Sequence, residues 1–220
     1  MNIVRRFAVA PALALALGAF PALAEETPTP SSAAPGSASA PVAVVAVALW
    51  NPVQTSDENT SIRGLRLDLP YGKNYDLQGL DFGIASETQR NLTGASFTLG
   101  SSVGHNVLGV QSAFVLALAG GTVYGLQEGI YSEARDLHGV QFGVVTQVER
   151  QSYGARFAAV NLGDTHEGAE LGIVNTSKRS SGLQLGLVNV TQHLHGVQIG
   201  VVNVAKNGFL PFFPVMNAAL

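Results

Sequence analysis

One short phrase that recurs along the chain constrains the fold more than any other feature. Residues 182–189 read GLQLGLVN, and residues 196–203 read GVQIGVVN, fourteen positions later. The leading glycine recurs every fourteen to sixteen residues through ten units: Gly64, Gly79, Gly94, Gly109, Gly125, Gly139, Gly154, Gly168, Gly182 and Gly196. Tandem copies at this period predict a repeat architecture in which each unit packs mainly on its neighbours.

Within each unit, apolar and polar residues alternate, as in a half-buried β-strand. If the glycine is position zero, positions one, three and five are mostly apolar, and we expect them to form the core. Position two is polar in every unit: Arg66, Asp81, Ser96, Gln111, Gln127, Gln141, Arg156, Glu170, Gln184 and Gln198. Position seven is asparagine in the later units: Asn161, Asn175, Asn189 and Asn203.

These phrases, with LWNPVQ before them and NGFLPFFPVMN after them, resemble a family of bacterial surface-repeat proteins. Members of that family carry tandem G-(L/V)-Q-x-G-(L/V)-(V/I)-N units and are functionally uncharacterised. The resemblance covers roughly residues 42–220. It implies an exported protein of the cell envelope, and it implies no catalytic residues.

The N-terminus has the pattern of a cleaved secretion signal over residues 1–24. Arg5 and Arg6 precede an apolar run, and Ala22 and Ala24 supply the small residues of a cleavage site. Residues 25–41 are rich in Pro, Ser and Ala and are predicted to form a disordered linker. The chain contains no cysteine, so neither a lipoprotein anchor nor disulfides are available to it.

Charge argues against a nucleic-acid partner. The formal net charge is −3, and loss of Arg5 and Arg6 with the signal leaves ten basic against fifteen acidic residues. No basic stripe remains on the repeats to neutralise phosphates.

The preferred fold is an all-β solenoid of about twelve units over residues 42–220, with degenerate units at both ends. Gly and Asn are predicted to mark its corners, because both tolerate left-handed backbone. Equivalent residues of successive units then stack, so Gln184 lies over Gln198 and Asn189 over Asn203. Phe142 and Phe157 are expected to stack within the core, at about 4.8 Å. The proline-bearing last unit, aligned through Asn217, belongs at an edge.

An antiparallel up-and-down β-barrel in the outer membrane is the alternative. Its apolar columns would face lipid, with Gly and Gln facing the lumen. The nearly constant unit length and the mid-strand phenylalanines favour the solenoid, because barrels alternate short and long connections and place aromatic residues at the interfaces.

No arrangement of residues points to catalysis, a cofactor or a metal. The five histidines fall near unit boundaries, where solvated turn positions are expected: His105, His138, His166, His193 and His195. His193 and His195 share a strand face but lack a third ligand. Glu128 interrupts an apolar column and is expected either to face solvent or to meet Arg135.

The polar column is therefore the candidate site. We expect an outward stripe that includes Gln141, Arg156, Glu170, Gln184 and Gln198 and binds an extended partner. The partner would be an envelope glycan or another surface protein, and membrane association is left open. The sequence thus predicts an exported, non-enzymatic structural or binding protein of the bacterial cell envelope or surface; the alternative is a barrel acting as a small pore or display platform.

Overall fold

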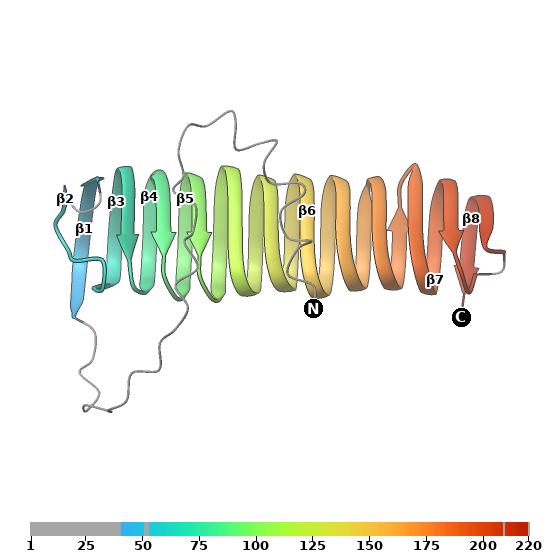
Figure 1. Cartoon of the computed structure of the whole chain (residues 1–220), viewed down its shortest axis with the longest axis horizontal. Helices are drawn as coiled ribbons and strands as arrows, with labels where there is room; N and C mark the ends of the chain where they lie inside the picture. The colour runs from blue at the N-terminus through green and yellow to red at the C-terminus, as the bar shows by residue number, and fades with distance from the viewer. Residues whose placement is uncertain (1–40, 51–52, 209, 220) are drawn as a thin grey trace, which may run out of the picture. The chain divides into compact units, whose positions relative to one another are not determined.

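The computed structural model of the chain describes residues 41–50, 53–208 and 210–219. The predicted signal peptide, and the predicted linker except Pro41, lie outside these residues. The described residues form a β-solenoid of about ten turns, whose coils stack along one axis (Figure 1). Since the described part of the chain contains no helix, it also contains no apolar helix long enough to cross a membrane.

All described strands belong to a single sheet, in the order β2-β1-β3-β4-β5-β6-β7-β8. Their bounds are β1 Val42–Trp50, β2 Val53–Gln54, β3 Ser61–Asn74, β4 Leu77–Thr88, β5 Leu92–Val103, β6 Val107–Leu185, β7 Val188–Ala205 and β8 Phe212–Ala219. Strand β6 winds through several coils without interruption. Its backbone stays extended and hydrogen-bonded to the neighbouring coils around each corner.

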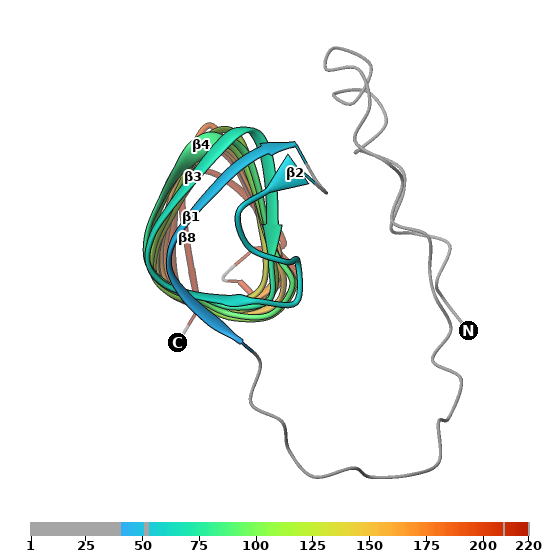
Figure 2. The ribbon, with the colours of Figure 1, turned by 90° about the vertical axis from the view of Figure 1, so that its left-hand side faces the viewer.

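Successive coils pair in parallel with a register of one repeat unit. Gly64 is opposite Gly79, and Gly79 is opposite Gly94. Viewed along the axis, the coils superimpose into one closed outline (Figure 2). The prediction of a solenoid is confirmed, and the antiparallel barrel is wrong because neighbouring coils run in the same direction.

The recurring glycine turns the chain at a corner of every coil. The φ angles of these ten glycines lie between 123° and 148°, a region that L side chains rarely adopt. A Cβ built on Gly139 would lie 2.1 Å from the carbonyl oxygen of Gly125 in the coil before. The predicted left-handed asparagine corners are wrong, since Val215 is the one non-glycine residue with positive φ among the described residues.

A column two residues before each glycine points into the solenoid. It is apolar in the first six coils, with Ile62, Leu77, Leu92, Val107, Val123 and Leu137. The next three members are polar but equally buried: Ser152, His166 and Ser180. The apolar core is therefore concentrated in the N-terminal half, and the C-terminal half has a more polar interior.

Each end of the solenoid carries an atypical strand. β1 pairs in parallel with β3, with Val45 opposite Leu65 and Val47 opposite Leu67, as expected of a degenerate first unit. β8 is the last strand of the sheet, which confirms the predicted edge position. It runs antiparallel to β7, so Asn217 lies opposite Gln198, and its predicted alignment with the repeat asparagines is wrong.

The phenylalanines stack as predicted but not where predicted. The rings of Phe142 and Phe157 are 4.9 Å apart and nearly parallel, at 12°. Phe142 nevertheless has 40% of its surface exposed. The expectation of a phenylalanine core is therefore wrong: these ladders lie on the outside of the solenoid.

Candidate functional site

The polar residues at position two of each unit, here called the position-two column, point into the solenoid. All ten members have no solvent-exposed surface. The predicted outward binding stripe of Gln141, Arg156, Glu170, Gln184 and Gln198 is therefore wrong. Position four is small in most units, as at Gly143, which leaves room for a long side chain at position two. The narrow coil buries amides instead of phenyl rings.

Glutamines of the position-two column hydrogen-bond from coil to coil. The Nε2 of Gln127 donates to Gln111 Oε1 at 3.0 Å, and Gln141 Nε2 donates to Gln127 Oε1 at 2.7 Å. Further along, Gln198 Nε2 donates to Gln184 Oε1 at 2.7 Å. The predicted stacking of Gln184 and Gln198 is confirmed. Each bond offsets the cost of burying an amide, which is about 1–3 kcal/mol when a group is left unpaired.

The asparagines at position seven form a second internal ladder, here called the asparagine column. Asn161, Asn175 and Asn189 each donate from Nδ2 to the Oδ1 of the next asparagine, always at 2.8 Å. Each Nδ2 also donates to a backbone carbonyl of the following coil, as from Asn175 to Leu185 at 3.0 Å. The predicted stacking of Asn189 on Asn203 is confirmed, and this ladder ties adjacent coils together from inside.

Charged members of the position-two column pair with each other across neighbouring coils. Arg66 donates from Nε and Nη2 to the two carboxylate oxygens of Asp81, both at 2.9 Å. Asp81 also accepts from Ser86 and Ser96. Burial works to raise the pKa of Asp81, but the charge and hydrogen bonds of Arg66 outweigh it and the pKa is lowered. Burial, with the nearby Asp81, raises the pKa of Asp68 to about 7, despite its contact with Arg66.

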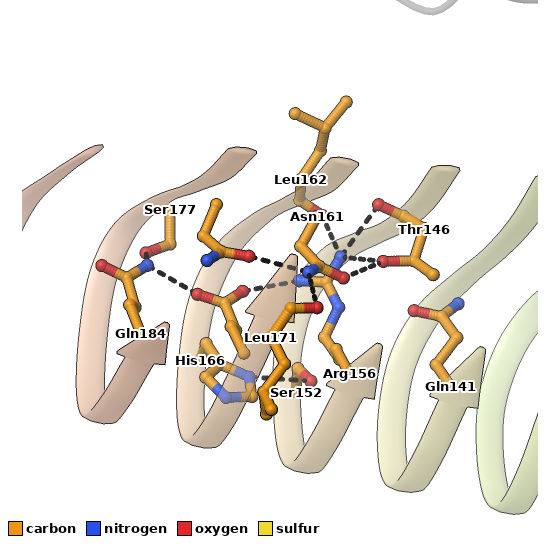
Figure 3. A network of polar contacts seen from close by, with 12 residues as sticks. Gln141, Thr146, Ser152, Arg156, Asn161, Leu162, His166, Leu171, Ser177 and Gln184 are labelled. Atoms are coloured by element: carbon orange, nitrogen blue, oxygen red, sulfur yellow. Dashed lines mark hydrogen bonds and ion pairs between the residues drawn. The ribbon is translucent and has the colours of Figure 1, made fainter. Parts of the chain in front are cut away.

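The second charge pair is Arg156 with Glu170 (Figure 3). Arg156 Nη1 donates to Glu170 Oε1 at 3.0 Å, and both side chains are fully buried. Arg156 Nη2 also donates to the carbonyls of Thr146 and Leu162, at 2.9 and 2.7 Å. Burial lowers the pKa of Arg156 to about 10, which leaves it charged at neutral pH. Burial also raises the pKa of Glu170, against the effect of Arg156.

His166 differs from the sequence expectation. It is fully buried, and its Nδ1 lies 3.1 Å from Ser152 Oγ. Burial lowers the pKa of His166 to about 3, and the positive charge of Arg156 contributes a smaller part of this shift. The imidazole is therefore neutral. The solvated turn position predicted for His166 is wrong, whereas His193 and His195 are exposed as expected. Within the described residues, no group of three His, Asp or Glu side chains is placed to hold a metal ion.

The outer surface made by positions one, three and five of the ten coils is here called the apolar face. Strand alternation puts these side chains outside, because positions two and four point inward. All are apolar except Ser112 and Glu128, and none is buried. About half of them are exposed, such as Phe82 at 41%, Val144 at 52% and Val201 at 64%, and the others are half-buried.

Glu128 is exposed on the apolar face, as one of the two sequence alternatives proposed. Ser112 Oγ, in the preceding coil, donates to its Oε2 at 3.1 Å. The described contact is therefore with Ser112 and not with Arg135. The two residues form a polar interruption near the middle of a surface that is otherwise apolar.

No protein-family model, curated protein or solved structure matches this chain in comparisons with known proteins. The resemblance to surface-repeat proteins therefore stays a prediction. The inference about function depends on the two surfaces of the coil: polar columns that are sealed inside and apolar columns that are exposed.

Proposed function

We propose that the protein is an exported, non-enzymatic structural or binding protein of the bacterial cell envelope, and that it works through its apolar face. The observation that carries this proposal is the inverted distribution of side chains. The polar groups that recur from coil to coil, amides and ion pairs, lie inside and hold neighbouring coils together. What the repeats present outward in every coil is hydrocarbon, which favours adhesion over catalysis.

The buried charges support a structural role for the interior. Arg156 pairs with Glu170, and Arg66 pairs with Asp81, and all four side chains are buried. Such groups cannot reach a substrate without opening the coil. A paired, inaccessible arginine and carboxylate are suited to fixing the register of stacked coils, a use in which buried polar groups specify one arrangement.

The N-terminal sequence supports export. A basic start, an apolar stretch and Ala22 and Ala24 match a secretion signal, and the repeats that follow contain no cysteine to be oxidised or lipidated. The apolar face then meets an environment rich in membranes and other surface molecules. Large exposed apolar patches mark interaction sites in soluble proteins.

Cell fractionation tests the proposal. The full chain, produced in a Gram-negative host, is expected in the envelope fraction, with Glu25 at its N-terminus by intact-mass measurement. Replacing Ile84 and Val144 of the apolar face with lysine is expected to release the folded protein into the soluble exported fraction. Retention of residues 1–24 together with a cytoplasmic location would contradict export, and unchanged envelope retention of the lysine variant would contradict a role for this face.

A further inference from the structure

The dimensions of the apolar face exceed what an isolated soluble protein exposes. Ten strands about 4.8 Å apart and five residues of about 3.3 Å each give a surface of about 45 by 16 Å, or roughly 700 Å². The largest apolar patch on a typical monomer is about 300–600 Å². In addition, Ser112 and Glu128 are the only polar side chains on this face. We therefore expect a binding partner to cover this surface.

Aromatic residues are sorted across this face. Phenylalanines lie within it, as the stacked pairs Phe82 with Phe97 and Phe142 with Phe157. Four of the five tyrosines lie along its two margins: Tyr71 and Tyr131 follow position five of their coils, and Tyr124 and Tyr153 directly precede the corner glycine. The fifth, Tyr75, lies four residues before Gly79 and has Arg90 over its ring. An arrangement with phenyl rings in the middle and phenol rings at the borders is found where a protein meets the boundary of a lipid layer.

The marginal tyrosines direct their hydroxyl groups away from the apolar face. Tyr131 Oη donates to Glu133 Oε2 at 2.7 Å, and Tyr71 Oη donates to Glu87 Oε2. Both carboxylates belong to residues beyond the border of the face. On the opposite margin, His138 stacks between Tyr124 and Tyr153, at 5.0 and 4.8 Å. The margin before the corner glycine is therefore polar in most coils, whereas the margin after position five is polar at Tyr71 and Tyr131 and continues as valine in the later coils, as at Val145 and Val202.

Glu128 argues against a second copy of the chain as the occupant. It lies in the fifth of ten coils, so a two-fold axis that overlaps two apolar faces along their full length brings both Glu128 side chains within about one coil of each other. Two carboxylates would then share a dry interface, which is costly. A lipid surface brings no second carboxylate, and Glu128 keeps its hydrogen bond from Ser112 Oγ there.

On these grounds we infer that the apolar face lies on the hydrocarbon boundary of a lipid leaflet, with the solenoid axis parallel to the membrane. This inference rests on the proposed function and names the partner of its working surface. Apart from Glu128, every charged side chain of the ten coils lies inside or on the other outer surfaces, and loss of Arg5 and Arg6 with the predicted signal leaves ten basic against fifteen acidic residues. Attachment is therefore by apolar burial and not by attraction to anionic headgroups.

Flotation of the full chain with phosphatidylcholine vesicles tests this inference. Wild-type protein is expected to float with the vesicles, equally at about 0.1 M and about 0.5 M NaCl, because apolar burial is not screened by salt. The Ile84→Lys/Val144→Lys variant should lose at least tenfold in bound fraction. The matched control, Thr176→Lys/Gln192→Lys, adds the same charge away from the apolar face and should float as wild type. Circular dichroism verifies that all three proteins keep their β-sheet content.

Three results would overturn the inference. The first is wild-type protein that does not float but sediments as a dimer that the lysine pair at Ile84 and Val144 dissociates, since the occupant is then a second copy. The second is flotation that high salt abolishes, and the third is equal loss in the control variant. If vesicles fail while envelope retention in cells still requires Ile84 and Val144, the proposed function stands and only the lipid assignment is wrong.

Discussion

At the scale of single residues, the corner glycine combines two separate requirements. Its φ is unfavourable for any side chain, and its α-carbon packs against the backbone of the coil before it. Gly163 offers a contrast: its φ is not in the left-handed region, and the nearest backbone atom to an added Cβ, Val148 O, would be 3.4 Å away. The same substitution at the two glycines therefore separates corner strain from the general effect of adding a methyl group.

We expect Gly139→Ala to cost more than 2 kcal/mol, because about 1–3 kcal/mol of backbone strain adds to the 2.1 Å clash with Gly125. Gly163→Ala should cost less, since its first contact is the end of the Arg156 side chain. Urea unfolding followed by circular dichroism measures both. Equal losses would show that the corner conformation is not what requires glycine.

The buried ion pair gives a prediction with an internal rescue. Glu170→Gln leaves the Arg156 guanidinium without its counter-charge and should cost about 3–5 kcal/mol. Changing Arg156 to Gln as well replaces the pair with the commonest residue of this column and should restore stability to within about 1 kcal/mol of wild type. The free energy of unfolding of the two variants is the measurement. A double variant no more stable than the single one would refute the account of charge pairing.

His166 should make stability depend on acidity. Its pKa is about 3 when folded and about 6.5 when unfolded, so below about pH 6.5 the unfolded chain binds a proton that the folded chain does not. Its stabilising contribution is therefore complete above that pH and is lost toward pH 3, by about 1.4 kcal/mol per unit. His166→Ser, which matches Ser152 and Ser180 of its column, should flatten this slope. Asp68, with its raised pKa, acts in the opposite direction but equally in both proteins, so the difference reports on His166.

At the scale of the coil, the sequence predicted the strands, their spacing and their stacking, because these follow from a period that is visible in the letters. It did not predict which side of the strand faces inward. Alternation separates Gln141 from Phe142 but says only that they are on opposite sides. On this strand the usual rule that apolar residues are inside fails, because hydrogen bonds between amides of successive coils offset their burial. The inward column of Ile62 and Leu77 still follows the rule.

The repeats nevertheless contained a sign that the polar side of this strand faces inward. The polar residue at position two was kept in all ten units, while position three accepted Phe, Leu, Ile, Ser and Glu. Position three mixes apolar residues with Glu128, which an outer position tolerates, whereas an inward position that mixed them would leave buried charges without partners. His166 could not be found in this way, because its burial depends on Ser152 and Ser180 flanking it in the same inward column.

Strand β8 closes the C-terminal edge of the sheet, and its removal has a specific consequence. Without residues 209–220, the backbone of β7 is left as an open parallel edge, and Asn203 Nδ2 loses its bond to Phe213 O. We expect concentration-dependent association, measurable by light scattering, because open edges recruit further strands. The control, Phe212→Ser/Phe213→Ser, removes apolar side chains but keeps the strand. If the control associates equally, the loss of the two phenyl rings, and not the open edge of β7, causes the association.

At the scale of the whole molecule, the solenoid is a linear array whose coils contact mainly their neighbours. Deleting residues 184–197 removes fourteen residues and joins Leu183 to Gln198, which keeps every column in register. We expect a folded protein with a somewhat lower free energy of unfolding. Deleting residues 184–196 removes thirteen and inserts one residue into the strand, which shifts Gln198 out of its column. Circular dichroism and thermal unfolding should show a clear loss for the second deletion, and equal behaviour would contradict a register fixed by these columns.

The two internal ladders point in opposite directions along the axis. Glutamines of the position-two column donate toward the N-terminus, as from Gln198 to Gln184, whereas those of the asparagine column donate toward the C-terminus, as from Asn175 to Asn189. Each ladder is a row of aligned amide dipoles, and two antiparallel rows cancel. An α-helix of this length would carry partial charges at its ends. In the C-terminal half, where Gln198 and Gln184 donate toward Glu170 beside the asparagine column, the opposed rows reduce the dipole that either row alone would build up as coils are added.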